Sequence, residues 1–348
     1  MATYHNEALQ TLFASVAERA AAQPNIALHS PGSAAEKTVG THRYTYWRVY
    51  LASGKHKEIS LGRSGEPATL AALEARLLDS AEVRALTTDA QVLRKAGFAA
   101  ADNSSALTIA TIFNAGIFAH GAVLVGSHAF GALLNAFGRR LTANYRTEDI
   151  AIAIGTAGTI SVAIPEDRSF LEILRDSDLP FLEVPSLDSR RPATSFKARG
   201  QPLKVDLLVP GTTRYETKPL PHLKAHATGL PYFKYLLSGP GAGVVLGKEH
   251  VVPVMLPDPA RFALHKLIVS TLRRPSDALK ADKDIRQAAF LIDALTDRFP
   301  DWLVAAADAL DGGARTRAKK AASRAAALTL GVSPRASDYL ASLAAGAG

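Results

Sequence analysis

The sequence predicts an α+β protein built on a mixed sheet with helices. Three consecutive segments carry this prediction. GAVLVGS (121–127) is an apolar run that ends in Gly-Ser, AFGALLNAFG (129–138) has a helical pattern, and DIAIAI (149–154) is a second apolar run. LKVDLLVP at 203–210 has the Val- and Leu-rich composition of a third strand. This order of strand, turn, helix and two strands indicates a mixed α/β core of about one hundred residues.

The N-terminal part predicts helices around a β-hairpin. Residues 5–23, 67–96 and 105–118 repeat apolar side chains at helical spacing. After a loop rich in Pro, Gly and Ser at 23–40, RYTYWRVYLASGKHKEISLG at 43–62 alternates aromatic and polar residues around a Ser-Gly turn. This pattern is typical of a hairpin, here with a basic tip.

The hairpin has two interpretations. One is an arm that docks RNA or a partner protein, because bases stack on aromatic rings beside cations. Its residues would be Tyr44, Tyr46, Trp47, Arg48, Lys55 and Lys57. The other is a hairpin whose aromatic face packs on its own domain, and the sequence alone favours this second interpretation.

The C-terminal third predicts a glycine-rich hairpin at 239–254 followed by helices. Asp258 and Pro259 open a helix that runs through RFALHKLIVSTLRR, and DKDIRQAAFLIDALTDRF forms the next one. The basic, Ala-rich segment at 312–328 reads as a solvated helix, with contact to a phosphate backbone as the alternative. We therefore expect an N-terminal region at 1–100, a core at 101–215 and a hairpin followed by a helical domain at 216–348.

Composition narrows the class of protein. The 348 residues include 47% hydrophobic residues, and their number exceeds what one growing core sustains, so two or three packed units are expected. Cysteine is absent, which excludes disulfides and Cys-ligated metal sites. No segment approaches the roughly twenty apolar residues of a membrane span, and no signal peptide is evident, so we expect a cytoplasmic protein. The net charge of +8 favours an anionic partner such as RNA or nucleotide phosphates.

One glycine-rich segment is not a phosphate loop of the Walker type. Counting back from Gly247 and Lys248, the required first glycine is Ala242, and Glu249 occupies the position of the magnesium-binding hydroxyl. Gly126 and Ser127 are better candidates, because a glycine lets the backbone approach phosphate and amides at the start of a helix bind anions.

Carboxylates follow this turn at positions that suggest catalysis. Residues two apart in a strand share one face, so Asp149 and Ala151 project together, and Asp206 lies in the third strand among apolar neighbours. Three carboxylates on adjacent strands can hold two Mg²⁺ ions that serve the attacking hydroxyl and the leaving pyrophosphate. Asp149 and Asp206 supply two of the three.

Longer segments resemble a known family: LVGSHAFGALLNAFG, RTEDIAIAI, SLDSRRPATSFKARGQPLKVDLLVP and PDPARFALHKLIVSTLRR followed by KADKDIRQAAFLI. They are similar to the GSU2403-type nucleotidyltransferase-fold family of bacterial proteins and, more distantly, to AbiEii-type nucleotidyltransferases of abortive-infection and toxin-antitoxin systems. The resemblance covers roughly residues 40 to 310. It implies a polymerase-β-like core with a helical C-terminal domain that closes over the nucleotide, and two Mg²⁺ ions, or Mn²⁺ in their place.

The resemblance also implies roles for single residues. The phosphate-binding turn falls on Gly126 and Ser127, and the first and third metal carboxylates fall on Asp149 and Asp206. A Lys-Leu pair that faces the triphosphate falls on Lys266 and Leu267, and an acidic signature of the next helix falls on Lys283 and Asp284. From the residues themselves, Lys197, Arg199 and Arg261 are further candidates for phosphate or RNA contact, whereas His265 is expected to be structural.

The second metal carboxylate of the family falls on Ala151. Glu148 does not replace it, since strand alternation points that side chain to the opposite face. Two explanations stay open, a natural loss that leaves a nucleotide-binding pseudoenzyme and a deliberate Asp-to-Ala change that silences the enzyme; the intact flanking pattern favours the second.

The sequence thus predicts a Mg²⁺-dependent nucleotidyltransferase. It would transfer NMP from an NTP to a hydroxyl acceptor, preferably RNA such as a tRNA 3′ end, as a toxin or phage-defence protein that has an antitoxin or another protein partner. Transfer to a protein side chain is the alternative reaction, and a non-catalytic nucleotide-binding module is the alternative class. With Ala151 in place, we expect this chain to be inactive or impaired in turnover and to bind nucleotide better than it turns it over.

Overall fold

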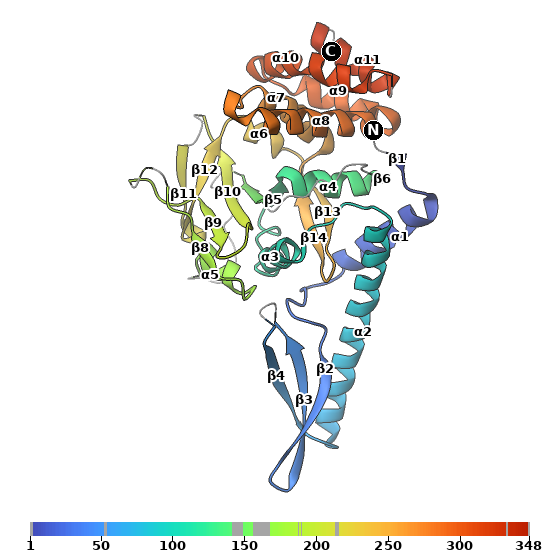
Figure 1. The fold of residues 1–348 in the computed structure, drawn as a ribbon, viewed down its shortest axis with the longest axis vertical. Coiled ribbons are helices and arrows are strands. Elements are labelled where there is room, and N and C mark those ends of the chain that lie inside the picture. Colours follow the sequence, from blue (N-terminus) through green and yellow to red (C-terminus); the bar gives the residue numbers. More distant parts are fainter. Residues whose placement is uncertain are drawn as a thin grey trace.

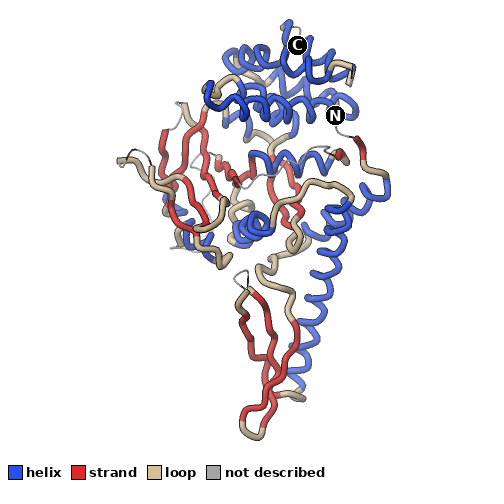
Figure 2. The backbone as a smooth tube through the Cα atoms, viewed as in Figure 1, coloured by secondary structure: helices blue, strands red, loops and turns tan. Residues whose placement is uncertain are grey.

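The computed structural model describes residues 3–51, 54–140, 149–155, 168–186, 188, 190–212, 216–331 and 333–346. Figure 1 shows an elongated molecule with an N-terminal arm at one end, a central body of strands and helices, and a layer of C-terminal helices at the other end. The α+β class predicted from the sequence is confirmed, and Figure 2 shows how strands and helices divide between these parts.

The arm combines one long helix with a small antiparallel sheet of order β2-β3-β4. Its elements are β2 (Ser33–Val39), β3 (His42–Tyr50), β4 (His56–Arg63) and α2 (Pro67–Lys95), and α1 (Glu7–Ala21) packs beside α2. The hairpin predicted over 43–62 is confirmed as β3 and β4, although its predicted turn at Ser53 lies outside the described residues. β2 was predicted as loop, and it forms a strand because its backbone pairs with β3 from Ser33 to Val39.

Seven strands of the described chain form the central sheet, in the order β11-β12-β10-β7-β5, with β8 and β9 attached through the pairing of β9 with β10. Their bounds are β5 (Ala122–Val125), β7 (Asp149–Ile154), β8 (Phe181–Glu183), β9 (Ser195–Ala198), β10 (Lys204–Pro210), β11 (Glu216–Leu220) and β12 (Ala225–Leu230). β10 runs parallel to β7 and β12, whereas β5 runs antiparallel to β7. The sheet is therefore mixed, as predicted, and it continues beyond residue 215, where we expected the core to end.

Alternation along the central strands separates a core face from a solvent-facing one. On β10, Val205, Leu207 and Val209 are buried, and the intervening Asp206 and Leu208 are only half-buried. The helices α3 (Asn103–Asn114), α4 (Gly126–Ala136) and α5 (Phe170–Arg175) belong to the same body. The polar face of β10 and β7 is thus left available for a site.

The C-terminal part begins with one short helix, continues with the predicted glycine-rich hairpin and ends in a series of helices. Its elements are α6 (Phe233–Leu236), β13 (Gly241–Leu246), β14 (Val251–Leu256), α7 (Pro259–Ser270), α8 (Ala278–Arg298), α9 (Pro300–Asp308), α10 (Gly312–Thr329) and α11 (Pro334–Ala345). The Asp258 carboxylate accepts a hydrogen bond from the Arg261 amide at 2.8 Å and so caps α7.

Two short strands outside these parts, β1 (Thr3–Tyr4) and β6 (Arg139–Arg140), pair with each other. Across the described helices, none combines the length and apolarity that crossing a membrane requires.

Candidate functional site

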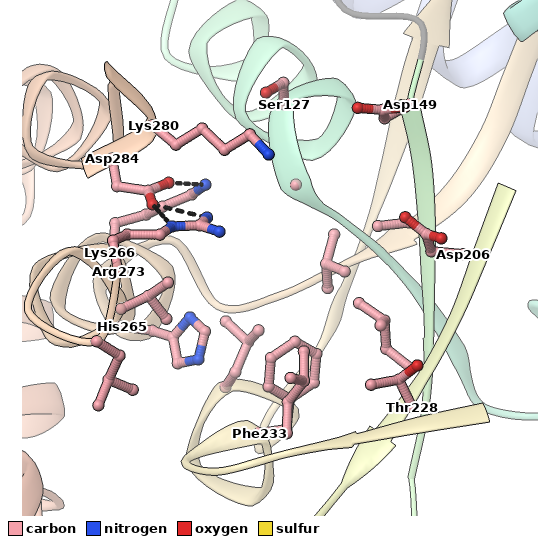
Figure 3. A pocket seen from close by; sticks show the side chains of 18 of the residues that line it. Ser127, Asp149, Asp206, Thr228, Phe233, His265, Lys266, Arg273, Lys280 and Asp284 are labelled. Carbon is pink, nitrogen blue, oxygen red and sulfur yellow. Dashed lines mark hydrogen bonds and ion pairs between the residues drawn. The ribbon is translucent and has the colours of Figure 1, made fainter. Parts of the chain in front are cut away.

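A cavity of about 490 Å³ opens between the polar face of the central sheet and helices α7 and α8. Figure 3 shows two carboxylates on the sheet side, a cluster of cations on the helix side and the start of α4 above them. The described lining contains five Lys or Arg side chains and three Asp side chains, namely Lys204, Lys266, Arg273, Lys280, Lys283, Asp149, Asp206 and Asp284. This excess of positive charge favours an anionic ligand.

The sheet side of the cavity holds the predicted carboxylates. Asp149 and Ala151 both line the cavity, which confirms that they share one face of β7. The parallel pairing of β7 with β10 places Asp206 directly beside Ala151 and Lys204 beside Asp149. The predicted third carboxylate therefore stands next to the methyl group of Ala151.

Asp206 is already engaged by its neighbours. Its Oδ1 accepts a hydrogen bond from Ser195 Oγ at 2.5 Å and lies 2.7 Å from Lys204 Nζ. Ser195 reaches Asp206 because β9 pairs with β10 in antiparallel register at these residues. A carboxylate oxygen that already accepts a hydrogen bond from a hydroxyl and pairs with an ammonium group attracts a further cation less strongly.

The start of α4 provides a second feature of the site. Gly126 has φ 77°, a left-handed conformation that favours glycine, and it opens the helix directly after β5. The N-cap residue Val125 makes no side-chain capping bond, so within the part of the chain that the structure describes the first amides of α4 can bind an anion at the cavity. The Ser127 hydroxyl also borders the cavity, 3.4 Å from Gln287 Nε2.

The helix side of the cavity holds a buried ion cluster. Asp284 on α8 is 3% exposed, and its two oxygens separately bind Lys266 Nζ at 2.8 Å and the Arg273 guanidinium at 2.9 and 3.0 Å. Burial alone would raise the pKa of the Asp284 carboxyl, but these two cations hold it below its ordinary value. Asp284 therefore positions Lys266 and Arg273 at the cavity wall rather than facing a ligand itself.

Two further lysines on α8 border the same space. Lys280 and Lys283 lie three residues apart on α8, and Figure 3 shows Lys280 reaching toward the start of α4. Burial and the nearby Lys266 charge lower the pKa of Lys283, whereas Asp284 and Asp149 oppose that shift. Bringing an anion to this wall relieves repulsion among its cations.

The remaining end of the cavity is mainly apolar. Phe233, Leu230 and Leu208 line it together with the ring of His265, which meets Phe233 edge-on at 5.2 Å between centroids. His265 is 4% exposed, and burial lowers its pKa to about 3, so the ring is neutral. Among the described residues its Nε2 is buried and has no hydrogen-bond partner. We expected His265 to be structural, but the structure places it in the lining of the cavity.

The described residues of the cavity do not form the two-ion magnesium site that the family resemblance implied. No three His, Asp or Glu side chains of the described chain come together as a metal-binding group. Ala151 has no ligand atom, and Asp206 is paired with Lys204. Glu148, the conceivable substitute, lies outside the described residues.

The structure brings together most of the side chains predicted from the sequence. The residues at the cavity are Gly126, Ser127, Asp149, Ala151, Asp206, Lys266, Lys283 and Asp284. The described lining does not include Lys197, Arg199 or Arg261; Lys197 and Arg199 lie at the exposed end of β9, and the Arg261 guanidinium lies 5.0 Å from the Tyr235 ring centroid.

The sequence reasoning missed several cavity residues, among them Lys204, Lys280, Ser195 and Arg273. Lys204 stands two residues before Asp206 on the same strand face, and Lys280 stands three residues before Lys283 on the same helix face, so both carried a local signal. Ser195 and Arg273 carried none, because strand pairing and helix packing alone bring them to the site.

Comparisons with known proteins agree with this geometry. A family model described as "Nucleotidyltransferase" matches residues 103–311. No curated protein and no solved structure matches the chain. The family match spans more than half of the chain and includes every described residue that lines the cavity, from Val125 to Asp284. The protein therefore belongs to the nucleotidyltransferase family.

Proposed function

We propose that the cavity binds a nucleoside triphosphate for transfer of NMP to a hydroxyl acceptor. One observation carries the proposal: the uncapped start of α4 and the cations of α7 and α8 face a pair of carboxylates across one cavity. Helix amides and clustered ammonium groups are the partners that polyphosphates require. The volume of about 490 Å³ lies within the range of small-molecule sites.

In this proposal the β- and γ-phosphates lie between Ser127 and the lysines of α8. Lys266 and Arg273, held by Asp284, complete the phosphate wall. The acceptor oxygen attacks the α-phosphorus, the bond to the bridging oxygen breaks, and pyrophosphate leaves with its charge against these cations. The proton of the acceptor hydroxyl passes to a carboxylate on the sheet side or to water.

We propose further that this chain performs the transfer poorly. The family pattern has three carboxylates, and the position beside Asp206 is Ala151. Two carboxylates, one of them paired with Lys204, stabilise less of the charge that develops at the α-phosphate. We therefore expect dependence on Mg²⁺ or Mn²⁺ in an Ala151→Asp variant.

RNA is the acceptor that we favour. The net charge of +8 supports a polyanionic partner, and a ribonucleotide end supplies hydroxyl groups. A protein side chain is the alternative acceptor. Digestion of the labelled product with ribonuclease or with protease distinguishes the two.

The test compares the chain with Ala151→Asp and Ala151→Asn, where Asn matches Asp in size without its charge. Each is incubated with α-labelled NTPs, Mg²⁺, total RNA and cell lysate, and NTP binding is measured in parallel by calorimetry. Label transfer by Ala151→Asp, at least tenfold above both other proteins, is the expected result. Absence of NTP binding in all three would overturn the site.

A non-catalytic nucleotide-binding module is the second candidate. The observation that favours it is the ion pair of Lys204 with Asp206, which places a resident cation beside the missing carboxylate. Intact NTP binding with no label transfer by any of the three proteins would select this function over the enzyme.

A further inference from the structure

We infer that the outer face of the β2-β3-β4 sheet docks single-stranded RNA. This inference deepens the proposed function, on which the choice of RNA in part rests. The outer face is defined here as the side of the sheet that carries Tyr44, Tyr46, Arg48 and Tyr50.

Alternation along β3 divides its side chains between two environments. Thr45, Trp47 and Val49 are 2 to 9% exposed, and α2 is the helix that packs on this sheet. The intervening Tyr44, Tyr46 and Arg48 are only half-buried, and Tyr50 is 49% exposed. We expected the aromatic face of the hairpin to pack on its own domain. Trp47 is packed in this way, whereas the three tyrosines lie on the other face of the sheet.

Pairing with the neighbouring strands places cations and hydroxyls among these rings. Lys37 and Arg63 flank Tyr44 from the two sides, and His56 lies beside Tyr50. The Lys37 ammonium lies 5.5 Å from the centroid of the Tyr46 ring. Three aromatic rings therefore alternate with positive charge on one open surface.

The strand segment of the arm carries a net positive charge. Residues 33–63 contain six Lys or Arg and two Glu, a net charge of +4, which is half of the +8 carried by the whole chain. One of these acids, Glu58, is held by Lys37 and by Arg48, whose Nη2 lies 2.8 Å from Glu58 Oε1. The register places Lys37, Arg48 and Arg63 on the outer face against Glu58 alone, so this face is complementary to a polyanion.

Single-stranded RNA combines the features that this surface matches. Unpaired bases stack on aromatic rings while cations follow the phosphates, an arrangement that a duplex does not permit. Ser33 is paired with Arg48 and Ser60 with Tyr46, so both hydroxyls lie on the outer face within the row of rings. Hydroxyls of this kind can bond the ribose 2′-OH, which DNA lacks.

A protein partner matches the face less well. An apolar docking surface would need aliphatic side chains, and the outer positions of β2 offer Ala35 and Val39. Larger exposed aliphatic residues of the arm lie elsewhere: Leu70, Leu77 and Leu78 on α2, and Ile59 beside Trp47 on the opposite face of the sheet.

The arm and the cavity are separate in space. Figure 1 shows the β2-β3-β4 sheet at one end of the molecule, away from α7 and α8, which form a wall of the cavity. RNA binding and NTP binding can therefore be measured as independent properties of one protein.

The test uses the full chain and fluorescein-labelled oligouridine, with fluorescence anisotropy at low and physiological salt. The triple variant Tyr44→Leu, Tyr46→Leu and Tyr50→Leu removes the rings and keeps apolar bulk. The matched control Tyr44→Phe, Tyr46→Phe and Tyr50→Phe keeps the rings. We expect the Leu variant to lose at least roughly tenfold in affinity, and the Phe variant to stay within about threefold of the parent.

A charge control separates the arm from general electrostatics. Lys37→Gln with Arg63→Gln, which lie beside Tyr44 on the outer face, should weaken binding and reduce its salt dependence, whereas Lys320→Gln with Arg335→Gln, on α10 and α11, should leave both unchanged. Circular dichroism confirms that each variant is folded.

Several results would overturn the inference. They are no binding of oligouridine by the parent, equal loss in the Leu and Phe variants, equal loss in the two charge variants, and tighter binding of oligothymidine than of oligouridine. NTP binding is measured on the same preparations. If the parent binds NTP but not oligouridine, only the docking face is contradicted; if the parent binds oligouridine but not NTP, only the proposed function is contradicted.

Discussion

Asp206 lies directly beside Ala151 in the parallel pairing of β10 with β7. A Cβ built on Gly126 would lie 3.6 Å from the Ala151 Cβ, so the start of α4 stands over the same position. The glycine turn at the start of α4, one carboxylate and the methyl group of Ala151 thus meet at one point. Whatever side chain occupies position 151 acts on both the anion site and Asp206.

Restoring a carboxylate at this point should change the response of the protein to metal. Ala151→Asp places a like charge beside Asp206 and should lower the free energy of unfolding by about 1 kcal/mol in EDTA. Mg²⁺ should then raise Tm by several degrees, because an ion bound only to the folded state stabilises it. Thermal unfolding with and without MgCl₂ measures both effects.

The isosteric Ala151→Asn variant is the control for that measurement, since it adds similar volume without charge. It should show neither the loss in EDTA nor the gain with Mg²⁺. An equal rise of Tm in the parent chain would contradict the conclusion that the residues present do not form the metal site.

Asp284 should be a positioning residue for the phosphate wall. Asp284→Asn removes the charge that holds Lys266 and Arg273 and leaves buried cations without their partner, so unfolding should become easier by roughly 3 kcal/mol. NTP affinity should fall about tenfold, because the two cations lose their geometry. Urea denaturation and calorimetry supply the measurements.

The neighbouring surface pair provides a matched control for Asp284. Asp282 binds Arg324 at 2.6 Å, but their side chains are 49 and 64% exposed. Asp282→Asn should therefore cost less than about 1 kcal/mol and leave NTP affinity unchanged. Similar losses in both variants would mean that burial of the Asp284 cluster has no special role.

Gly126 should matter through its backbone rather than its size. At φ 77° an alanine is strained by roughly 1 to 2 kcal/mol, although its Cβ would make only an ordinary contact. Gly126→Ala should lower stability by that amount and weaken NTP binding as the α4 amides shift. Gly312→Ala, where a Cβ meets nothing within 4 Å and φ is not positive, should have little effect on either measurement.

The sequence predicted those parts of the fold and site that depend on local pattern. Alternation in β7 correctly placed Asp149 and Ala151 on one face, and the Gly-Ser pair marked the start of α4. Contacts across elements were beyond such reasoning, because the register of β9 on β10 brings Ser195 to Asp206. β2 was missed for a related reason, since the Pro and Gly residues that signal a loop lie just outside SAAEKTV, and its pairing with β3 makes this segment a strand.

Two buried histidines should make the protein sensitive to acid. Burial lowers the pKa of His265 to about 3 and that of His128 to about 4, against an ordinary value of 6.5 in the unfolded chain. Between pH 6.5 and pH 5 the unfolded state therefore binds protons that the folded state does not, and stability falls as pH falls. The loss should be about 2 kcal/mol per histidine by pH 5.

Urea denaturation from pH 8 to pH 5 measures this dependence, and substitutions assign it. His265→Gln should remove about 2 kcal/mol of the decline by pH 5, because the buried ring no longer takes up a proton on unfolding. His222→Gln replaces an exposed histidine and should leave the decline intact. Among the described residues the Nε2 of His265 has no partner, so an anionic ligand that accepts a hydrogen bond from it should raise the pKa of the folded-state ring and reduce the decline in the parent but not in His265→Gln. A pH dependence that is the same in all three proteins would show that the His265 ring is protonated equally in the folded and unfolded states.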